Sequence, residues 1–354
     1  MLFKSSCLIK MLLFSKKDIA VSICVPVYGT EMLLDRCFNS VAVQNFSGFE
    51  LVVVDDCSNG TDEKGRNCSK IVKDFKKSVK FPVTYIKHQE NKGIAESRKT
   101  AIYASKGKYL IFLDSDDTLK ENAVEILYKA ITENNCSVVQ GIAQVFGDDL
   151  TEDEKSIVDK KVNCLFEGEL KGSEFIAGFL ENSNHSGFLW AKIYERETIL
   201  NAISHIPPIY CILAEDFLIY FWVCYEASKN GGKYLGIKQP VYNYWMQNGI
   251  TRKQKIEDLD RWEKTCSVAS AFTALFTEFE EINERGEKLE LNEAQYKEVK
   301  RLCRAFLANN IKALRSKVIP ELQQQAYQIL CEFWGEDFVK EVEKLVDAKE
   351  ARGM

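Results

Sequence analysis

The chain has 354 residues, of which 46% are hydrophobic and 28% are charged, and its formal net charge is -5. This length exceeds the usual size of one domain, and the composition is typical of soluble globular proteins rather than of disordered or membrane-spanning chains. The negative charge argues against nucleic acid as a partner, because phosphate backbones bind basic surfaces.

The twelve cysteines are scattered without any C-x-x-C pair, and the chain holds three histidines. This pattern predicts neither a zinc site nor a disulfide framework, so we interpret the cysteines as reduced thiols of a cytoplasmic protein. At the N-terminus, residues 1–19 mix lysines with an apolar run, residues 11–14, that is too short to span a bilayer. Two interpretations stay open for this segment: a loosely docked terminus, and an amphipathic stretch that contacts the inner face of the membrane.

From residue 20 to about 146, short apolar stretches rich in β-branched residues alternate with amphipathic ones. This alternation predicts βαβ units, and therefore an α/β fold with a mostly parallel sheet flanked by helices on both faces. The expected strands cover residues 21–28, 50–56, 83–88, 109–117 and 137–146. The expected helices begin near residues 32, 66, 94 and 123.

The rest of the chain is interpreted in order as an acidic surface region, an extended piece, a buried helix and an aromatic strand, over residues 147–185, 187–199, 214–227 and 241–246. From Leu259 onward the apolar spacing is helical, with breaks near Gly286 and Pro320. These helices carry charges of both signs without an acidic cluster or a basic stripe, which predicts packing or partner contacts rather than chemistry. The expected division is an N-terminal segment, an α/β domain and a helical C-terminal extension: residues 1–19, 20–258 and 259–354.

The acidic run 114–117 (DSDD) closes one of the apolar strands. In parallel sheets ligands bind at the carboxyl ends of strands, and a hard divalent cation that also binds phosphate oxygens needs only one or two protein carboxylates. The alternative is helix capping by Asp117 or Thr118. A second acidic pair, Asp55 and Asp56, ends a neighbouring expected strand and favours a ligand site.

Asn91 and Gly93 suit a tight turn that enters a helix, and Arg98 follows about one turn later. The free N–H groups of a helix start favour an anion, and an arginine there can meet a phosphate or a carboxylate. The alternative is an ordinary helix start with a surface arginine.

Three stretches carry a resemblance to a known family: VSICVPVYGTEMLLDRCFNSVAVQNFSGFELVVVDDCSNGT, NKGIAESRKTAI and KGKYLIFLDSDDTL. They resemble, in order, the donor domain of the family 2 glycosyltransferases, which have the GT-A fold. The resemblance implies a donor half (20–125) and an acceptor half (126–258). The implied base-holding residues are Val27, Tyr28 and Asp56, and Pro26 is implied as a further donor-binding residue. The residues implied to line the rest of the nucleotide pocket are Asn91, Gly93, Arg98, Asp114, Ser115 and Asp116. A divalent metal, Mn2+ or Mg2+, is implied on Asp116 and Asp117.

On the acceptor side, AEDFLIYF is similar to the family's E-D element, which implies that Asp216 is the general base and Glu215 its neighbour. The alternative is that two acids at a helix start interact with the helix dipole. The stretch FLWAKIYER resembles an element that implies contacts of Trp190 and Lys192 with sugar rings and phosphate, although a buried tryptophan is more often part of a core.

The aromatic strand and the loop after it, VYNYWMQNGIT, resemble the family segment that closes over the diphosphate. Trp245 stands where the family often has arginine, so phosphate contact is open among Thr251, Arg252 and Lys253. Residues 247–254 are a candidate lid.

The resemblance thus implies a glycosyltransferase of the hexosyl or N-acetylhexosaminyl type. It would move a sugar from a UDP-sugar to a hydroxyl of a glycan or lipid-linked acceptor by a metal-dependent, inverting displacement. A non-catalytic sugar-nucleotide-binding protein is the alternative. A nucleotidyltransferase is disfavoured, because the first strand lacks a Gly-rich phosphate loop. The implied setting is cytoplasmic, in a bacterial polysaccharide or glycolipid pathway, with peripheral membrane contact and homo-oligomerisation left open.

Overall fold

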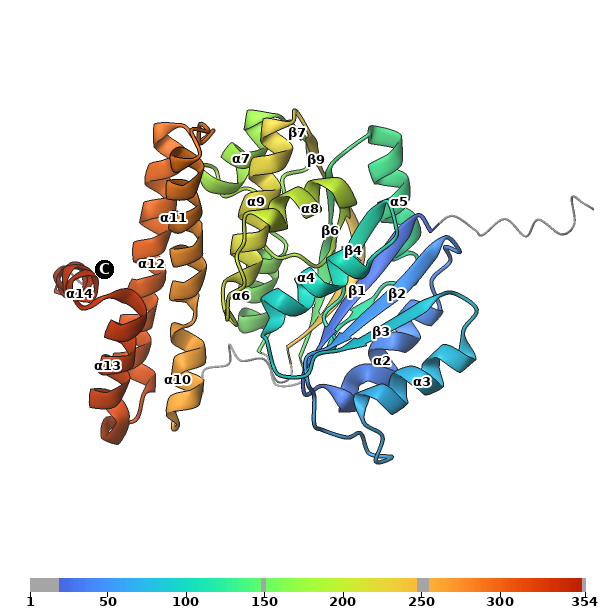
Figure 1. The fold of residues 1–354 in the computed structure, drawn as a ribbon, viewed down its shortest axis with the longest axis horizontal. Coiled ribbons are helices and arrows are strands. Elements are labelled where there is room, and N and C mark those ends of the chain that lie inside the picture. The colour runs from blue at the N-terminus through green and yellow to red at the C-terminus, as the bar shows by residue number, and fades with distance from the viewer. Residues whose placement is uncertain (1–18, 148–150, 247–254, 352–354) are drawn as a thin grey trace, which may run out of the picture.

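The computed structural model describes residues 19–147, 151–246 and 255–351. Figure 1 shows a central sheet flanked by helices, with a further layer of helices beside it. Four strands form the parallel half of the sheet in the order β3-β2-β1-β4. Their bounds are β1 Val21–Val27, β2 Phe49–Asp55, β3 Val83–Lys87 and β4 Tyr109–Phe112. Every residue of β1, β2 and β4 is buried, because helices cover both faces. The first three predicted strands are therefore confirmed to within one residue.

The other half of the sheet is mixed. Its strands are β8 Lys192–Glu195, β6 Val138–Phe146, β9 Lys233–Trp245, β5 Thr118–Leu119 and β7 Gly168–Lys171. Residues 137–146 form β6 as expected, and β6 runs parallel to β4, but the two strands do not pair with each other. The cause is insertion of the short strand β8, in which Ile193 pairs with Ile111 on one side and Val139 on the other.

Two sets of helices bury the faces of the sheet. One face packs against α2 Glu31–Ala42, α3 Cys68–Ser78 and α5 Ala123–Asn134. The other face packs against α4 Ile94–Ala104, α7 Ser173–Leu180, α8 Arg196–Ser204 and α9 Glu215–Lys229. The four predicted helix starts in the first 146 residues are confirmed to within two residues.

The acidic stretch expected at the surface forms α6 Glu152–Val162, most of which is exposed. Its first turn is fixed by a capping box, in which Thr151 Oγ1 accepts a hydrogen bond from the Glu154 N–H at 3.2 Å. In the described part of the chain, eleven cysteines are present and all are free thiols.

The C-terminal extension is helical, as predicted. Its elements are α10 Leu259–Cys266, α11 Val268–Glu284, α12 Glu293–Lys317, the 3-10 turn Pro320–Leu322, α13 Gln323–Trp334 and α14 Glu336–Glu350. Breaks at Gly286 and Pro320 are confirmed. Two further breaks lie at Ser267, between α10 and α11, and at Gly335, which has a φ of +82°. Within the described ranges, no helix has the length and apolar character that crossing a bilayer requires.

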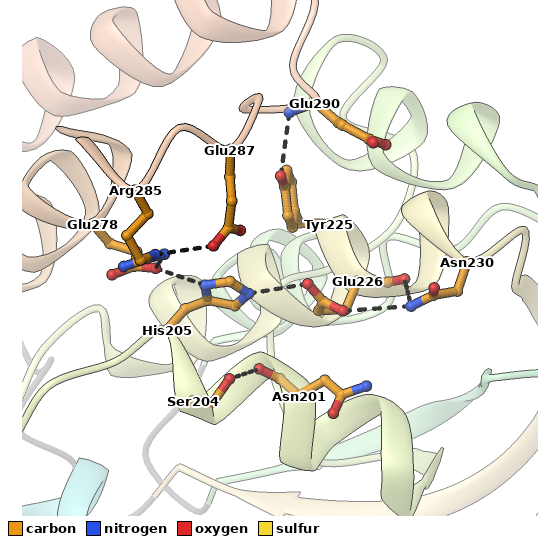
Figure 2. A network of polar contacts seen from close by, with 10 residues as sticks. All are labelled: Asn201, Ser204, His205, Tyr225, Glu226, Asn230, Glu278, Arg285, Glu287 and Glu290. Carbon is orange, nitrogen blue, oxygen red and sulfur yellow. Dashed lines mark hydrogen bonds and ion pairs between the residues drawn. The ribbon is translucent and has the colours of Figure 1, made fainter. Parts of the chain in front are cut away.

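His205, which caps the C-terminal end of α8, connects the extension to the sheet domain (Figure 2). Its Nε2 lies 3.0 Å from a carboxylate oxygen of Glu226 on α9, and its Nδ1 lies 2.9 Å from one of Glu278 on α11. Arg285 donates to the same Glu278 oxygen at 2.9 Å. The imidazole ring also stacks on Trp222 with 4.1 Å between centroids. This network joins α8, α9 and α11.

Candidate active site

Arg98 lies at the centre of the predicted site. Its side chain extends from α4, is buried, and bonds carboxylates from two other parts of the chain. Nη2 donates to Asp114 at 2.9 Å, and Nη1 donates to Glu215 at 2.8 Å and also to Asp216. The prediction that Arg98 meets a carboxylate is therefore confirmed, and the alternative of an ordinary surface arginine is wrong.

Asp56 and Gly93 explain why α4 begins at this point. Gly93 has φ +85° and ψ 165°, a conformation that residues with a Cβ rarely adopt. Its N–H donates to Asp56 Oδ2 at 2.8 Å, and the Lys92 N–H donates to Oδ1 at 2.9 Å. His88 Nδ1 lies 2.6 Å from the same Oδ1. Asp56 is thus buried and holds the turn before α4, and contact between Asp56 and a nucleobase stays a prediction.

The acidic run leaves the sheet as a turn, which ends the predicted strand 109–117 five residues early. The Asp117 N–H donates to the Asp114 carbonyl at 3.0 Å, and Ser115 Oγ accepts from Thr30 Oγ1 at 2.7 Å. The capping alternative is wrong, because Asn122 occupies the cap position of α5.

Asp117 fastens the acidic run to β9. Its buried carboxylate accepts hydrogen bonds from the Tyr242 hydroxyl at 2.8 Å and from the Trp245 N–H at 2.7 Å. Burial raises the pKa of Asp117 well above its ordinary value, and the charge of Asp116 adds to the shift. Both oxygens of Asp117 therefore already have partners within the protein.

Asp116 occupies a different environment. Burial, together with the negative charge of Asp114, raises the pKa of Asp116 to about 6. Arg36 of α2 donates to the Asp116 carbonyl, and its guanidinium lies 4.1 Å from the ring centroid of Trp245. The sequence analysis missed Arg36, because one arginine on an amphipathic helix has no distinguishing signal. Its cation lies against the tryptophan that stands where the family often has arginine.

The donor set is compatible with one divalent cation that shares its coordination with phosphate oxygens. In the ranges 19–147, 151–246 and 255–351, no cluster of three or more His, Cys, Asp or Glu side chains forms a closed metal cage. Asp116 carries a carboxylate to which no hydrogen-bonding side chain of the described residues is assigned, and burial beside the negative charge of Asp114 raises its pKa. A cation bound partly by substrate needs only one or two such carboxylates. Asp116 suits this role better than Asp117.

Glu215 and Asp216 form the first turn of α9, after Ala214 at φ +67°. Burial raises the pKa of both carboxyl groups, and the positive charge of Arg98 opposes this shift. The charge of Asp114 raises both pKa values further, and that of Asp216 also raises the pKa of Glu215. The Asp216 side chain is 20% exposed and that of Glu215 is 10% exposed. Asp216 is therefore the member of the pair that is more open to a substrate.

Trp190 and Lys192 are buried, so neither side chain is exposed at the surface of the predicted site. The Trp190 ring is buried and stacks on Tyr242 and Tyr244, with centroids 5.0 and 5.2 Å apart. Lys192 is fully buried, and its Nζ donates to Ser186 Oγ at 3.0 Å. Burial lowers the pKa of Lys192 to about 7. The core alternative for Trp190 is the one observed here.

The remaining predicted donor residues surround the end of β1. Pro26 and Val27 are buried strand residues, and the Val27 carbonyl accepts from the Asp56 N–H at 2.9 Å. Tyr28, at 55% exposure, and Asn91 are both open to solvent. The candidate lid 247–254, with Thr251, Arg252 and Lys253, lies outside the described residues.

Solved structures identify the fold class. TarS from S. aureus, residues 1–349 in complex with UDP, aligns with a TM-score of 0.58 and 18% identity over 95% of this chain and 92% of that one. The complex of the same protein with UDP-GlcNAc aligns with a TM-score of 0.58 and 21% identity over 93% of this chain and 83% of that one. The chain has the GT-A fold.

Sequence comparisons show similarity to one family. Residues 22–192 match the model of glycosyl transferase family 2. Glycosyltransferase GlyA of Streptococcus pneumoniae is 36% identical over 35% of this chain and 17% of the relative. Glycosyltransferase GlyG of the same organism is 34% identical over 34% of this chain and 38% of the relative. The putative glycosyltransferase EpsH of Bacillus subtilis is 27% identical over 51% of this chain and 48% of the relative. The aligned part spans less than half the length of each of these relatives.

Proposed function

We propose that the protein transfers a sugar from a UDP-sugar to a hydroxyl group of a glycan or lipid-linked acceptor, with inversion at the anomeric carbon. One observation carries this proposal: Arg98 bonds Asp114 of the acidic run and Asp216 of α9 at the same time. The guanidinium of Arg98 therefore holds the predicted donor-binding run and the candidate general base close to each other. The UDP and UDP-GlcNAc complexes of TarS, a protein with the same fold, agree with a uridine nucleotide donor.

In the proposed reaction, Asp216 accepts the proton of the acceptor hydroxyl while that oxygen attacks the anomeric carbon. The new carbon–oxygen bond forms as the bond from the anomeric carbon to the diphosphate breaks, and UDP leaves with the electron pair. A base works best when its pKa lies near the working pH. The raised pKa of Asp216, with Arg98 keeping the anionic form accessible, suits this task.

We propose Mn2+ or Mg2+ as the cofactor. Asp116 would hold it, with Asp117 beside it, and the cation would neutralise charge on the diphosphate. The chain's own contribution is positional. Asp117 fixes the run to β9, and Arg36 holds the backbone of Asp116.

Two variants test these roles. Asp216→Asn keeps the side-chain volume, so UDP-sugar affinity should survive while the turnover number falls by ~10²- to 10⁴-fold. Asp116→Asn should weaken donor affinity as well as turnover, and a chelator should weaken donor binding by the parent. Calorimetry and steady-state kinetics measure both effects. If Asp216 had only a structural role, through Arg98 and the helix dipole, its substitution would cost stability but leave transfer intact. Transfer by Asp216→Asn at close to the parent rate would remove it from the mechanism.

A non-catalytic sugar-nucleotide-binding protein is the second candidate, because it would share the same donor contacts. Slow hydrolysis of the donor by the purified parent, absent in Asp216→Asn, would favour the enzyme. Tight UDP-sugar binding without hydrolysis or transfer to any offered acceptor would favour the binding protein.

A further inference from the structure

The loop between α8 and α9, residues 205–214, is bonded to its surroundings near both ends. Near its start, Lys99 Nζ on α4 donates to the Ile206 carbonyl at 3.0 Å. Near its end, the Ile212 N–H donates to Ser267 Oγ at 3.2 Å, and Ser267 is a fully buried residue between α10 and α11. The loop is therefore held by the sheet domain on one side and by the C-terminal extension on the other.

Tyr210 lies between these two attachments and is 48% exposed. Its ring borders the turn before α4, because a Cβ placed on Gly93 would lie 3.5 Å from Cδ2 of Tyr210. Burial raises the pKa of the Tyr210 hydroxyl, and the positive charge of Lys264 on α10 opposes this shift. The ionisable groups of Tyr28 and Asp56 also act on it. An exposed aromatic ring thus lies next to the turn before α4, in a loop that is bonded both to α4 of the donor half and to the C-terminal extension.

A large exposed ring in a loop that is bonded on both sides of it loses little conformational entropy when a flat ligand stacks on it. Every nucleobase offers a flat π surface, and stacking on an aromatic side chain is a major source of nucleotide affinity. We propose that Tyr210 forms an aromatic wall of the nucleotide pocket that stacks against the base, and that the C-terminal extension positions this wall through Ser267. This inference rests on the proposed function, since it assumes a nucleotide donor.

The test compares a ligand that has a base with one that lacks it. Calorimetry would measure UDP and inorganic diphosphate, each with Mn2+, on the full chain and on Tyr210→Leu and Tyr210→Phe. We expect Tyr210→Leu to bind UDP roughly tenfold more weakly and inorganic diphosphate equally well. Tyr210→Phe keeps the ring and should bind UDP like the parent. The matched control is Tyr103→Leu, a tyrosine of α4 that is 61% exposed, which should change neither affinity.

The outcomes separate this inference from the proposed function. Unchanged UDP affinity in Tyr210→Leu would overturn the stacking role and leave the proposed function standing. An equal loss of UDP and inorganic diphosphate affinity would show a disturbed loop and would also overturn it. A parent chain that binds inorganic diphosphate but not UDP would overturn both.

Discussion

The Arg98 guanidinium holds together three carboxylates that are far apart in sequence. Its partners Glu215 and Asp216 lie 117 and 118 residues away from it, and Asp114 lies 16 residues away. A guanidinium can serve all three because it presents five N–H donors in a planar fork, whereas an ammonium group is a point charge. The three acids in turn compensate the burial of Arg98, so charge balance at the site depends on one residue.

We predict that Arg98→Ala destabilises the fold strongly, because it leaves three buried or half-buried carboxylates without their cation. Removing one partner of a buried ion pair typically costs ~3 to 5 kcal/mol, and urea unfolding would measure the loss. Arg66→Ala is the control. That arginine is only partly buried and bonds the exposed Asp35 and the half-buried Asp62, so its loss should cost less. Equal losses in the two variants would contradict a structural role for the Arg98 network.

At the scale of elements, the strands and their polar ends could be predicted, but the middle of the sheet could not. Strands β1 to β3 are apolar runs bounded by turn residues, and such local patterns are visible in sequence. Strand β8, Lys192–Glu195, is predicted only as part of an extended piece, because a strand of four residues has almost no hydrophobic pattern of its own. Its partners, Ile111 and Val139, are distant in sequence. For the same reason, the burial of Trp190 and Lys192 beneath the site could not be derived from their motif.

We predict that the junction of α8, α9 and α11 responds to pH through His205 (Figure 2). Burial alone would lower the pKa of His205, but hydrogen bonds to Glu226 and Glu278 outweigh it and raise the pKa. The hydrogen bond to His205 lowers the pKa of Glu226. Burial would raise the pKa of Glu278, but hydrogen bonds to His205 and Arg285 outweigh burial and lower it. A raised histidine pKa stabilises the fold fully below the ordinary value of about 6.5, and this contribution is lost as the pH rises through the folded-state pKa. The glutamates' contribution is lost as the pH falls below about 4.3.

Thermal unfolding of the parent and of His205→Gln between pH 5.5 and 9 measures this effect. His205→Gln should be less stable than the parent at pH 6, and this difference should shrink toward the alkaline end. Other groups whose shifted pKa lies in this window, such as Asp116 and Lys192, act on both proteins alike and cancel in the difference. The charge of Arg285 on the opposite side of Glu278 is present throughout and should not contribute to the slope. Parallel curves for the two proteins would show that His205 does not titrate in this window.

At the scale of the whole molecule, the C-terminal extension does not form a core of its own throughout. Helices α10, α12, α13 and α14 share one apolar cluster, but the buried side of α11 belongs to the same cluster as α8 and α9. Phe279 of α11 lies 5.8 Å, between ring centroids, from both Phe221 and Trp222 of α9. Since α9 also carries Asp216, the extension supports the helix that bears the proposed base.

We therefore predict that a chain ending at residue 258 does not fold cooperatively, because it exposes the apolar side of α9 that α11 covers. A milder variant makes the same point in the full chain. Phe279→Ala removes a buried ring and should cost ~3 to 5 kcal/mol, lowering the urea midpoint for tryptophan fluorescence and for UDP binding together. Leu330→Ala in the cluster of α13 should instead loosen the outer helices and leave UDP affinity at low urea unchanged, because that cluster contains no residue of α9. A chain ending at residue 258 that unfolds at the parent midpoint and binds UDP would show that the extension is an independent addition. If the chain ending at residue 258 does not fold cooperatively, α11 belongs to the α/β domain. The helix that presents Asp216 is then stable only when α11 covers it.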